Sequence, residues 1–189
     1  METKNSLFIS ALKAGLIIGA VSIALFLIMY VADIKPVGIM MPILILLISI
    51  AIGIIILVVL FKKYRTTIGG FISFGDAFLY CFIAFAISVI VSQFFSYLFV
   101  MLVEPEYYKQ IMDAQKAWME TYLAGKMPEE QIAQQLDKLD AQAAKMGTFS
   151  TLLKNLLGSM VLSAIIALIV GAIMKKKPEM FDNNSGGVI

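Results

Sequence analysis

The chain has 189 residues, of which 60% are hydrophobic and 15% are charged, and its formal net charge is +2. Soluble domains are about 45–50% apolar and about 25% charged, so this composition excludes a soluble globular protein and a disordered chain. The chain holds no histidine and one cysteine, Cys81. An intrachain disulfide framework and most catalytic and metal-site designs are therefore excluded as well.

Four uncharged runs of 19 to 27 residues divide the chain. A helix needs about 20 residues to cross about 30 Å of hydrocarbon, and these runs lack the alternation of a β-barrel. The first run is long for a signal-peptide core, so we expect it to remain as a span. The sequence predicts one all-α integral membrane domain over residues 1–189, with transmembrane helices at about 12–32, 37–61, 76–103 and 152–174.

Basic residues lie directly beside the ends of two predicted spans. Lys62, Lys63 and Arg65 follow the second span, and three lysines at 175–177 follow the fourth. Positive residues next to a span favour the cytoplasmic side of the membrane. We therefore expect both termini in the cytoplasm and the segment 104–154 on the extracytoplasmic side.

The connection between the third and fourth spans predicts a helical hairpin over residues 105–147. Gly125 is a suitable C-terminal cap for the first arm, and Pro128 suits the first turn of the second arm, which Gly147 closes. Apolar residues recur at steps of three and four on both arms, with Gln115 interrupting the first stripe. A turn this short favours an antiparallel pair.

Aromatic residues are more numerous on the first arm than the core of a short hairpin requires. Trp118 and Tyr122 are the clearest examples. Aromatic rings of this kind collect at the membrane surface or in protein interfaces. We expect these two to anchor the arm to the membrane surface or to contact a partner.

Small residues recur at four-residue intervals in three of the spans. Gly15 and Gly19 form such a row in the first span. Small side chains let helix backbones approach closely inside a membrane. We expect these rows to pack the four helices together, and a dimer or partner interface is the alternative. The other two rows are Ala84, Ser88, Ser92 and Ser96 in the third span and Ser159, Ser163, Ala167 and Gly171 in the fourth.

Ionisable residues are absent from the middle of every predicted span, whereas ion and proton pathways normally contain them. Gln93 is the strongly polar side chain near a midplane. We expect it to hydrogen bond to another helix. The alternative is a substrate contact in an oligomer that surrounds Gln93 and the serine row.

Two acids lie next to predicted spans. Asp33 follows the first span and Asp76 precedes the third, so the topology places them on opposite membrane faces. An aspartyl protease needs two carboxylates that share a proton, which this separation excludes. We expect Ser73 to cap the third helix, with Asp76 at its positive end.

The segment 64–75 joins a basic cluster to glycines and aromatic residues. Its composition is typical of an interfacial segment, with rings at the level of the lipid headgroups and cations facing anionic lipid. A phosphate-binding loop is excluded because no strand precedes the glycines and the lysine–serine ending is missing. We expect a lipid or partner contact here, with Arg65, Gly70, Phe71, Ser73, Phe74 and Asp76 as its candidate residues.

The order of these parts resembles the domain-of-unknown-function 4199 family of small bacterial membrane proteins. The resemblance depends on Ala11-Leu12-Lys13-Ala14-Gly15-Leu16-Ile17, on Lys62-Lys63-Tyr64-Arg65, and on Gly70-Phe71-Ile72-Ser73-Phe74-Gly75-Asp76-Ala77. The hairpin led by Pro105 and the lysines after the fourth span complete it. The family implies four spans in the bacterial inner membrane, and it implies no activity, cofactor or catalytic residue.

These patterns together predict a non-enzymatic accessory or scaffold subunit without cofactor, metal or catalytic residues. Its expected partners are the lipid bilayer and other membrane or envelope proteins, or further copies of itself. Nucleic acid is not expected, because acids and bases are nearly balanced in the hairpin. A small oligomeric transporter or channel is the alternative function, and an enzyme acting on lipid would depend on Ser73, Asp76 and the basic cluster alone.

Overall fold

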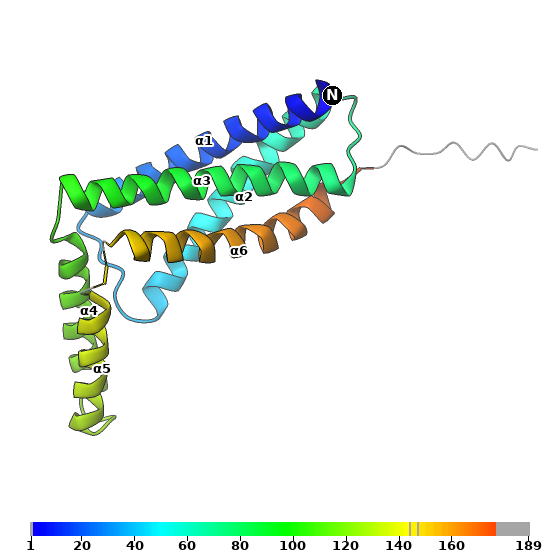
Figure 1. Ribbon diagram of the computed structural model, residues 1–189. Coiled ribbons are helices and arrows are strands. Elements are labelled where there is room, and N and C mark those ends of the chain that lie inside the picture. The colour runs from blue at the N-terminus through cyan, green and yellow to red at the C-terminus, as the bar shows by residue number, and fades with distance from the viewer. Residues whose placement is uncertain (1, 144, 147, 177–189) are drawn as a thin grey trace, which may run out of the picture.

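The computed structural model describes residues 2–143, 145, 146 and 148–176, and within this part the chain is all-helical apart from one isolated β-bridge (Figure 1). Four of its helices are long and apolar enough to cross a membrane. They correspond to the four predicted spans, with two shorter helices between the third and the fourth. The helices are α1 (Glu2–Val31), α2 (Met40–Thr67), α3 (Phe74–Leu102), α4 (Tyr107–Leu123), α5 (Glu129–Ala143) and α6 (Phe149–Met174).

The helices at the membrane boundary are longer than the predicted spans. α1 begins at Glu2 rather than near residue 12, and α2 continues to Thr67 rather than ending near residue 61. Charged residues mark the edge of the hydrocarbon but do not break a helix, because long cationic side chains extend from it into water. Gly147, which we expected to close the second hairpin arm, lies outside the described residues.

The long helix α3 lies at the centre of the molecule. It packs along α1 on one side and along α6 on the other, and α1 and α3 run in the same direction (Figure 1). α2 and α6 return in the opposite direction. The start of α1, the turn after α2 and the end of α6 therefore share one end of the molecule, and the α4–α5 hairpin occupies the other end.

α2 joins the other spans through its second half only. Ile39, Met40 and Leu44 are 57% or more exposed, whereas Leu57 and Phe61 are completely buried. The first half of α2 consists mostly of isoleucine and leucine, and close approach begins at Gly53. There a Cβ on the glycine would be in ordinary contact with Phe85 of α3 and Ile18 of α1, at 3.6 and 3.7 Å. The core is therefore concentrated at the end of the molecule where α2 terminates.

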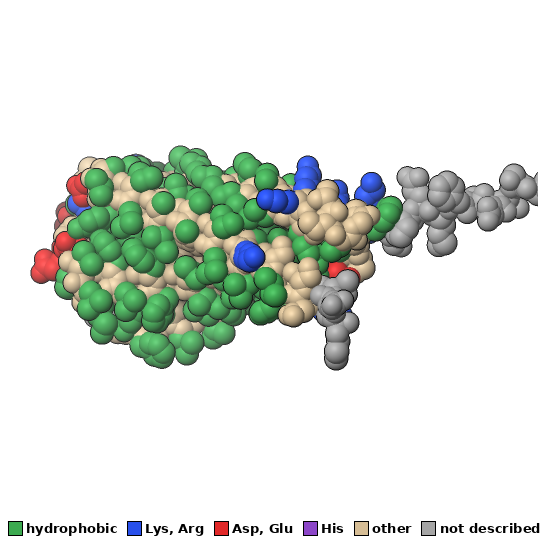
Figure 2. All heavy atoms as spheres, turned by 90° about the horizontal axis from the view of Figure 1, so that it is seen from above, with side chains coloured by type: hydrophobic (Ala, Val, Ile, Leu, Met, Phe, Trp, Pro, Cys, Tyr) green, Lys and Arg blue, Asp and Glu red, His purple; other side chains and the backbone are tan. Residues whose placement is uncertain are grey.

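Charged side chains separate towards the two ends of the molecule. On the face seen in Figure 2, most lysines and arginines lie towards the end where α1 begins, and most acidic side chains lie at the hairpin end. The surface between them is mainly hydrophobic. This is the distribution expected of helices that cross a bilayer.

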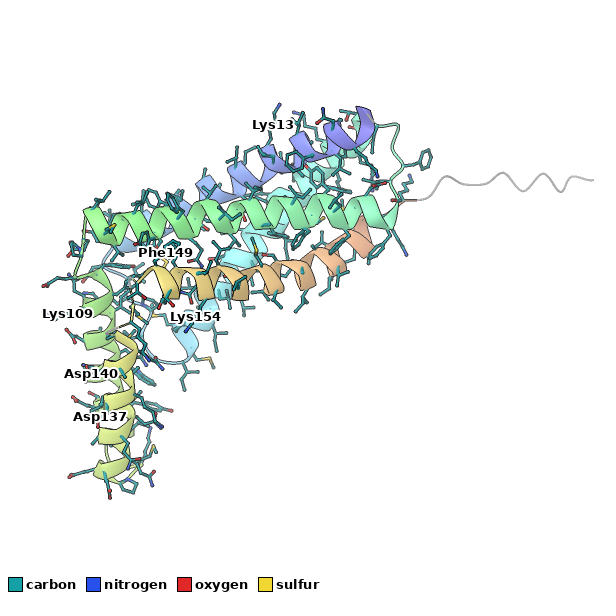
Figure 3. The ribbon with its side chains drawn as sticks, viewed as in Figure 1. Lys13, Lys109, Asp137, Asp140, Phe149 and Lys154 are labelled. Carbon is teal, nitrogen blue, oxygen red and sulfur yellow. The ribbon has the colours of Figure 1, made fainter. Side chains whose placement is uncertain are left out.

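The α4–α5 hairpin crosses the end of the bundle rather than extending its axis (Figure 1). Its turn places Gly125 at φ +74°, as a C-terminal glycine cap requires, and Lys116 of α4 forms an ion pair with Asp140 of α5. The hydrogen bond from Lys116 to Asp140 raises the pKa of the lysine above its ordinary value. Figure 3 shows Asp137 and Asp140 along the same arm.

Candidate functional site

The turn between α2 and α3 is built on two glycines. Gly69 and Gly70 have φ values of +90° and +85°, a region that other residues rarely adopt, and the Gly70 N–H donates to the Arg65 carbonyl over 2.9 Å. Beyond the glycines, Ile72 and Lys176 form an isolated antiparallel bridge with N–H to O distances of 2.9 and 3.2 Å. These two hydrogen bonds join the turn to the segment that follows α6.

Arg65 adds a further contact between the end of α2 and the end of α6. Its guanidinium Nη1 donates to the carbonyl of Met174, the last residue of α6, over 3.1 Å. A cation at this position satisfies an unpaired carbonyl and lies beside the negative end of the helix. The sequence predicted a lipid or partner contact for Arg65, and the structure gives this side chain a role inside the molecule.

Ser73 caps α3 as predicted. Its hydroxyl accepts from the Asp76 N–H over 3.1 Å and donates to a carboxylate oxygen of Asp76 over 2.7 Å. The two hydrogen bonds satisfy the Asp76 N–H and the Ser73 hydroxyl at the start of the helix, and they place the carboxylate at the positive end of the helix. The Asp76 carboxylate is therefore committed to the cap, and Asp33 lies at the opposite end of the parallel helix α1 (Figure 1).

A cavity of about 540 Å³ lies beside this turn. Lys4 and Lys176 contribute cations to its lining, and Asp76 contributes an acid. Phe71 and Phe74 also line it and remain 44% and 43% exposed. The turn therefore presents two aromatic rings beside mixed charges at the end of the spans, which suits contact with a membrane surface.

The glycine row of α1 lies within the molecule. A Cβ on Gly15 would be 2.6 Å from the Ala84 carbonyl and 2.7 Å from the Ile87 Cβ, and one on Gly19 would be 3.1 Å from Val91. Both glycines are buried against α3. The prediction that this row packs the helices together is confirmed, and neither glycine is open to a partner.

The small residues of α6 serve the same purpose on the other side of α3. A Cβ on Gly171 would be 3.0 Å from the Phe78 backbone, and Ser163 and Ala167 are buried. The two rows thus let α3 approach both neighbours closely, as small residues do in membranes. The hydroxyls of Ser88 and Ser92 bond to carbonyls of their own helix.

Gln93 lies between two small cavities. One, of about 200 Å³, is also lined by Ser22 and Ser96, and the other, of about 150 Å³, is also lined by Thr148 and Asn155. Among the described residues, the Gln93 amide has no hydrogen-bond partner, so the predicted bond to another helix is not found there. The amide instead faces space that polar groups line.

The hairpin is held to the loop between α1 and α2 by Trp118, a candidate contact residue, and by Gly38 and Gln115, which sequence analysis did not select as contact residues. The Gly38 N–H donates to the side-chain oxygen of Gln115 over 2.7 Å. Gly38 has φ +80°, and a Cβ there would be 3.0 Å from the Trp118 ring. Gln115 interrupts the apolar stripe because its side chain makes this hydrogen bond. A polar residue in an otherwise apolar stripe was the feature of the sequence that could have revealed the contact.

Tyr122 extends this contact along α4. Its ring stacks on Trp118 with a centroid distance of 4.7 Å, and the Lys126 Nζ lies 3.6 Å from the centre of the Tyr122 ring. Trp118 touches Gly38, immediately before α2 enters the apolar region. Trp118 therefore lies on the side of the hairpin that faces the loop before α2, and Tyr122 stacks on it.

The base of the hairpin has a second attachment. The Tyr30 hydroxyl of α1 donates to a Glu104 carboxylate oxygen over 3.2 Å, and the Gln110 amide donates to the other oxygen over 3.2 Å. Tyr107 is buried against Phe26 and Phe99, and this burial raises its pKa. The hairpin thus has one attachment at its base and another along α4.

The donor groups of the described chain do not form a metal site, since no three acidic or cysteine side chains converge within that part. Cys81 is completely buried in α3.

Comparison with known proteins places the chain in a family. No curated protein and no solved structure matches it. A family model described as protein of unknown function (DUF4199) matches residues 13–176, which include α1 from residue 13 onward, the other three long apolar helices and the hairpin. With its four span-like helices, the chain is an integral membrane protein that belongs to this family.

Proposed function

We propose that this membrane protein is a non-enzymatic accessory or scaffold subunit that docks other envelope proteins on its α4–α5 hairpin. The observation that carries this function is the hairpin's attachment. It is tied to the spans at Glu104, Gln115 and Trp118, yet it projects sideways across their ends. A surface held in one orientation loses little further freedom on binding, which favours docking.

The exposed surface proposed for docking lies on the second arm of the hairpin, α5. α5 has no buried residue in the described structure, and only one face of it packs on α4. Its outer positions carry amides and carboxylates rather than a broad apolar patch, so a suitable partner presents hydrogen-bond donors such as arginine. The glycine rows are not available for this purpose because they pack α1 and α6 onto α3. The exposed outer residues include Glu130, Gln131, Gln134, Asp137 and Gln142.

Photo-crosslinking tests the docking surface. Benzoylphenylalanine at Gln134 on α5 should give a discrete adduct with another envelope protein, because this side chain is exposed on the outer face. The same probe at Val161 on α6, which is 63% exposed, is the matched control and should meet lipid. Purification of a lone monomer without any adduct from Gln134 would contradict the proposed function.

The proposed orientation places both termini in the cytoplasm and the hairpin outside the inner membrane of a bacterium. It is supported by the basic residues that gather where α1 begins, at the end of the molecule opposite the hairpin (Figure 2).

Labelling of intact cells checks this orientation. Cys81 is replaced by serine, and single cysteines are placed at Lys4, Glu120 and Lys175, all of which are exposed. An impermeant maleimide should label the cysteine at position 120 and leave the other two unlabelled until the cells are opened. Labelling at position 4 or 175 in intact cells would reverse the orientation.

A small oligomeric transporter or channel is the second candidate, and the polar cavities around Gln93 favour it. In this case several copies of the chain would assemble so that the cavities lined by Gln93 form a continuous path for a solute. Solute flux into liposomes should then be lost in Gln93→Leu and kept in Tyr122→Leu, a change outside the spans. Absence of flux with the unchanged protein would leave the docking function as the sole candidate.

A further inference from the structure

A groove between α1 and α2 lies at the end of the molecule where the N-terminus and the α2–α3 turn meet. Its volume is about 560 Å³, and it is separate from the cavity beside the turn although Tyr64 lines both. The groove exists because α2 makes far fewer contacts with α1 than α3 does. We call it the α1–α2 groove.

Two cations lie on opposite walls of the α1–α2 groove. Lys13 comes from α1 and Lys63 from α2, and both are exposed. Lys13 projects from the outer side of its helix (Figure 3). Neither lysine forms an ion pair in the described part of the chain, and no acid lines the groove. Among the described side chains, the charge that lines the groove is therefore positive.

Hydroxyl groups also line the α1–α2 groove. Ser6 and Ser10 line the groove from α1, and Tyr80 of α3 forms its floor. Tyr80 is completely buried, and its hydroxyl lies 3.5 Å from that of Ser10. The hydroxyls of Ser6 and Ser10, which are not buried, and two ammonium groups are the donors that recognise phosphate oxygens.

The remaining walls are apolar. Ile9 and Ile17 of α1 and Leu60 of α2 line the groove, and the two isoleucines are 47% and 45% exposed. Lys13 and Lys63 each stand at the border of an uncharged run, so they lie at the level of the headgroups. A ligand that fits has an anionic head at this level and a hydrocarbon part that continues into the bilayer.

The cavity beside the turn does not have this character. Lys4 and Lys176 line it, but Asp76 lies among them and adds a negative charge. A carboxylate next to the site repels a phosphate. Of the two basic sites at this end, the α1–α2 groove is therefore the one that suits an anion.

We infer that the α1–α2 groove binds an anionic phospholipid, with the lipid phosphate between Lys13 and Lys63 and an acyl chain along Ile17 and Leu60. Basic pockets between transmembrane helices on the cytoplasmic side are suited to anionic headgroups. The occupant is a lipid of the surrounding leaflet rather than soluble phosphate, because the apolar walls would otherwise stay exposed beside the site.

Native mass spectrometry of the full-length protein in mild detergent tests this inference. Dioleoyl phosphatidylglycerol and dioleoyl phosphatidylcholine are titrated separately, and the anionic lipid should bind with at least about tenfold higher affinity, since each lysine near a lipid surface contributes about 1 kcal/mol. The Lys13→Gln/Lys63→Gln double variant should lose this preference. Inorganic phosphate at millimolar concentration should leave the bound lipid in place.

Two further variants separate the groove from general surface charge and from misfolding. Lys62→Gln/Lys175→Gln removes the same charge at the same end from lysines that do not line the groove, and it should keep the preference. Ser6→Trp fills the mouth without changing charge and should lose it. Melting temperatures of all variants in detergent confirm that they are folded.

Three results would overturn the inference. Equal binding of the two lipids by the unchanged protein would show that the groove has no preference for an anionic headgroup. An equal loss in both double variants would show general attraction to positive charge. Displacement of the lipid by inorganic phosphate would identify the groove as a site for soluble phosphate.

Discussion

Replacing Gly15 with leucine is expected to separate α1 from α3 and to destabilise the protein more than any other change at a small residue. The first added carbon would already lie 2.6 Å from the Ala84 carbonyl, and backbone cannot move aside as a flexible side chain can. Overpacking of this kind costs about 1–3 kcal/mol or more. The melting temperature in mild detergent should fall by roughly 5–10 °C.

Gly158 provides the matched control for this experiment. It is also a helical glycine within a span, but it is exposed and a Cβ there would have no neighbour within 4 Å. Gly158→Leu should therefore leave the melting temperature unchanged or raise it, because leucine has the higher helix propensity. Equal destabilisation by the two substitutions would show that the contact between α1 and α3 is not the cause.

Replacing Gly38 with alanine is expected to release the hairpin from the loop between α1 and α2. The substitution has two costs. An alanine at φ +80° costs about 1–2 kcal/mol, and its Cβ would lie 3.0 Å from the Trp118 ring, which must then move away. Hydrogen exchange should accelerate in α4 by roughly tenfold or more, since about 1.4 kcal/mol corresponds to a factor of ten.

Gly125 provides a control that separates the cost of the positive φ from the cost of the contact with Trp118. Its φ of +74° is nearly the same, but no atom lies within 4 Å of the position of its Cβ. Gly125→Ala should therefore accelerate exchange at the tip of the hairpin and leave the first turns of α4 protected. If Gly38→Ala left α4 as protected as in the unchanged protein, the contact with Trp118 would not hold the hairpin.

Variants at Gln115 test the hydrogen bond at the same attachment. Gln115→Glu keeps an acceptor for the Gly38 N–H and should preserve protection, whereas Gln115→Leu removes the acceptor and should accelerate exchange in α4. Equal behaviour of the two variants would show that packing of the Trp118 ring alone holds the hairpin.

The secondary structure was largely predictable because each element depends on local chemistry. Long uncharged runs must be helical in lipid, and Gly125 marks the turn of the hairpin through its positive φ. Ser73 and Asp76 form the expected cap three residues apart. The limits of α1 and α2 were less predictable, because Lys4, Lys13 and Lys62 mark the edge of the hydrocarbon while the helices continue past them.

The candidate sites were predicted less well because they depend on contacts between distant residues. Arg65 was assigned to a lipid or partner contact, which stays a prediction, and its bond to the end of α6, 109 residues away in the sequence, was not foreseen. Gln115 was treated as an interruption of an apolar stripe, whereas it accepts from Gly38, 77 residues away. No local pattern contains either contact.

The sequence by itself determined that the chain spans a membrane four times, that a helical hairpin precedes the last span, and that small residues bring the spans together. These properties follow from hydrophobicity, periodicity and residue size, which act over a few residues. Only the tertiary structure decided that α3 is central, that α2 packs through its second half, and that the hairpin lies across the ends of the spans. These features depend on which surfaces fit one another, as Gly53 fits against Phe85 and Gly38 against Trp118, and such complementarity exists only between folded elements.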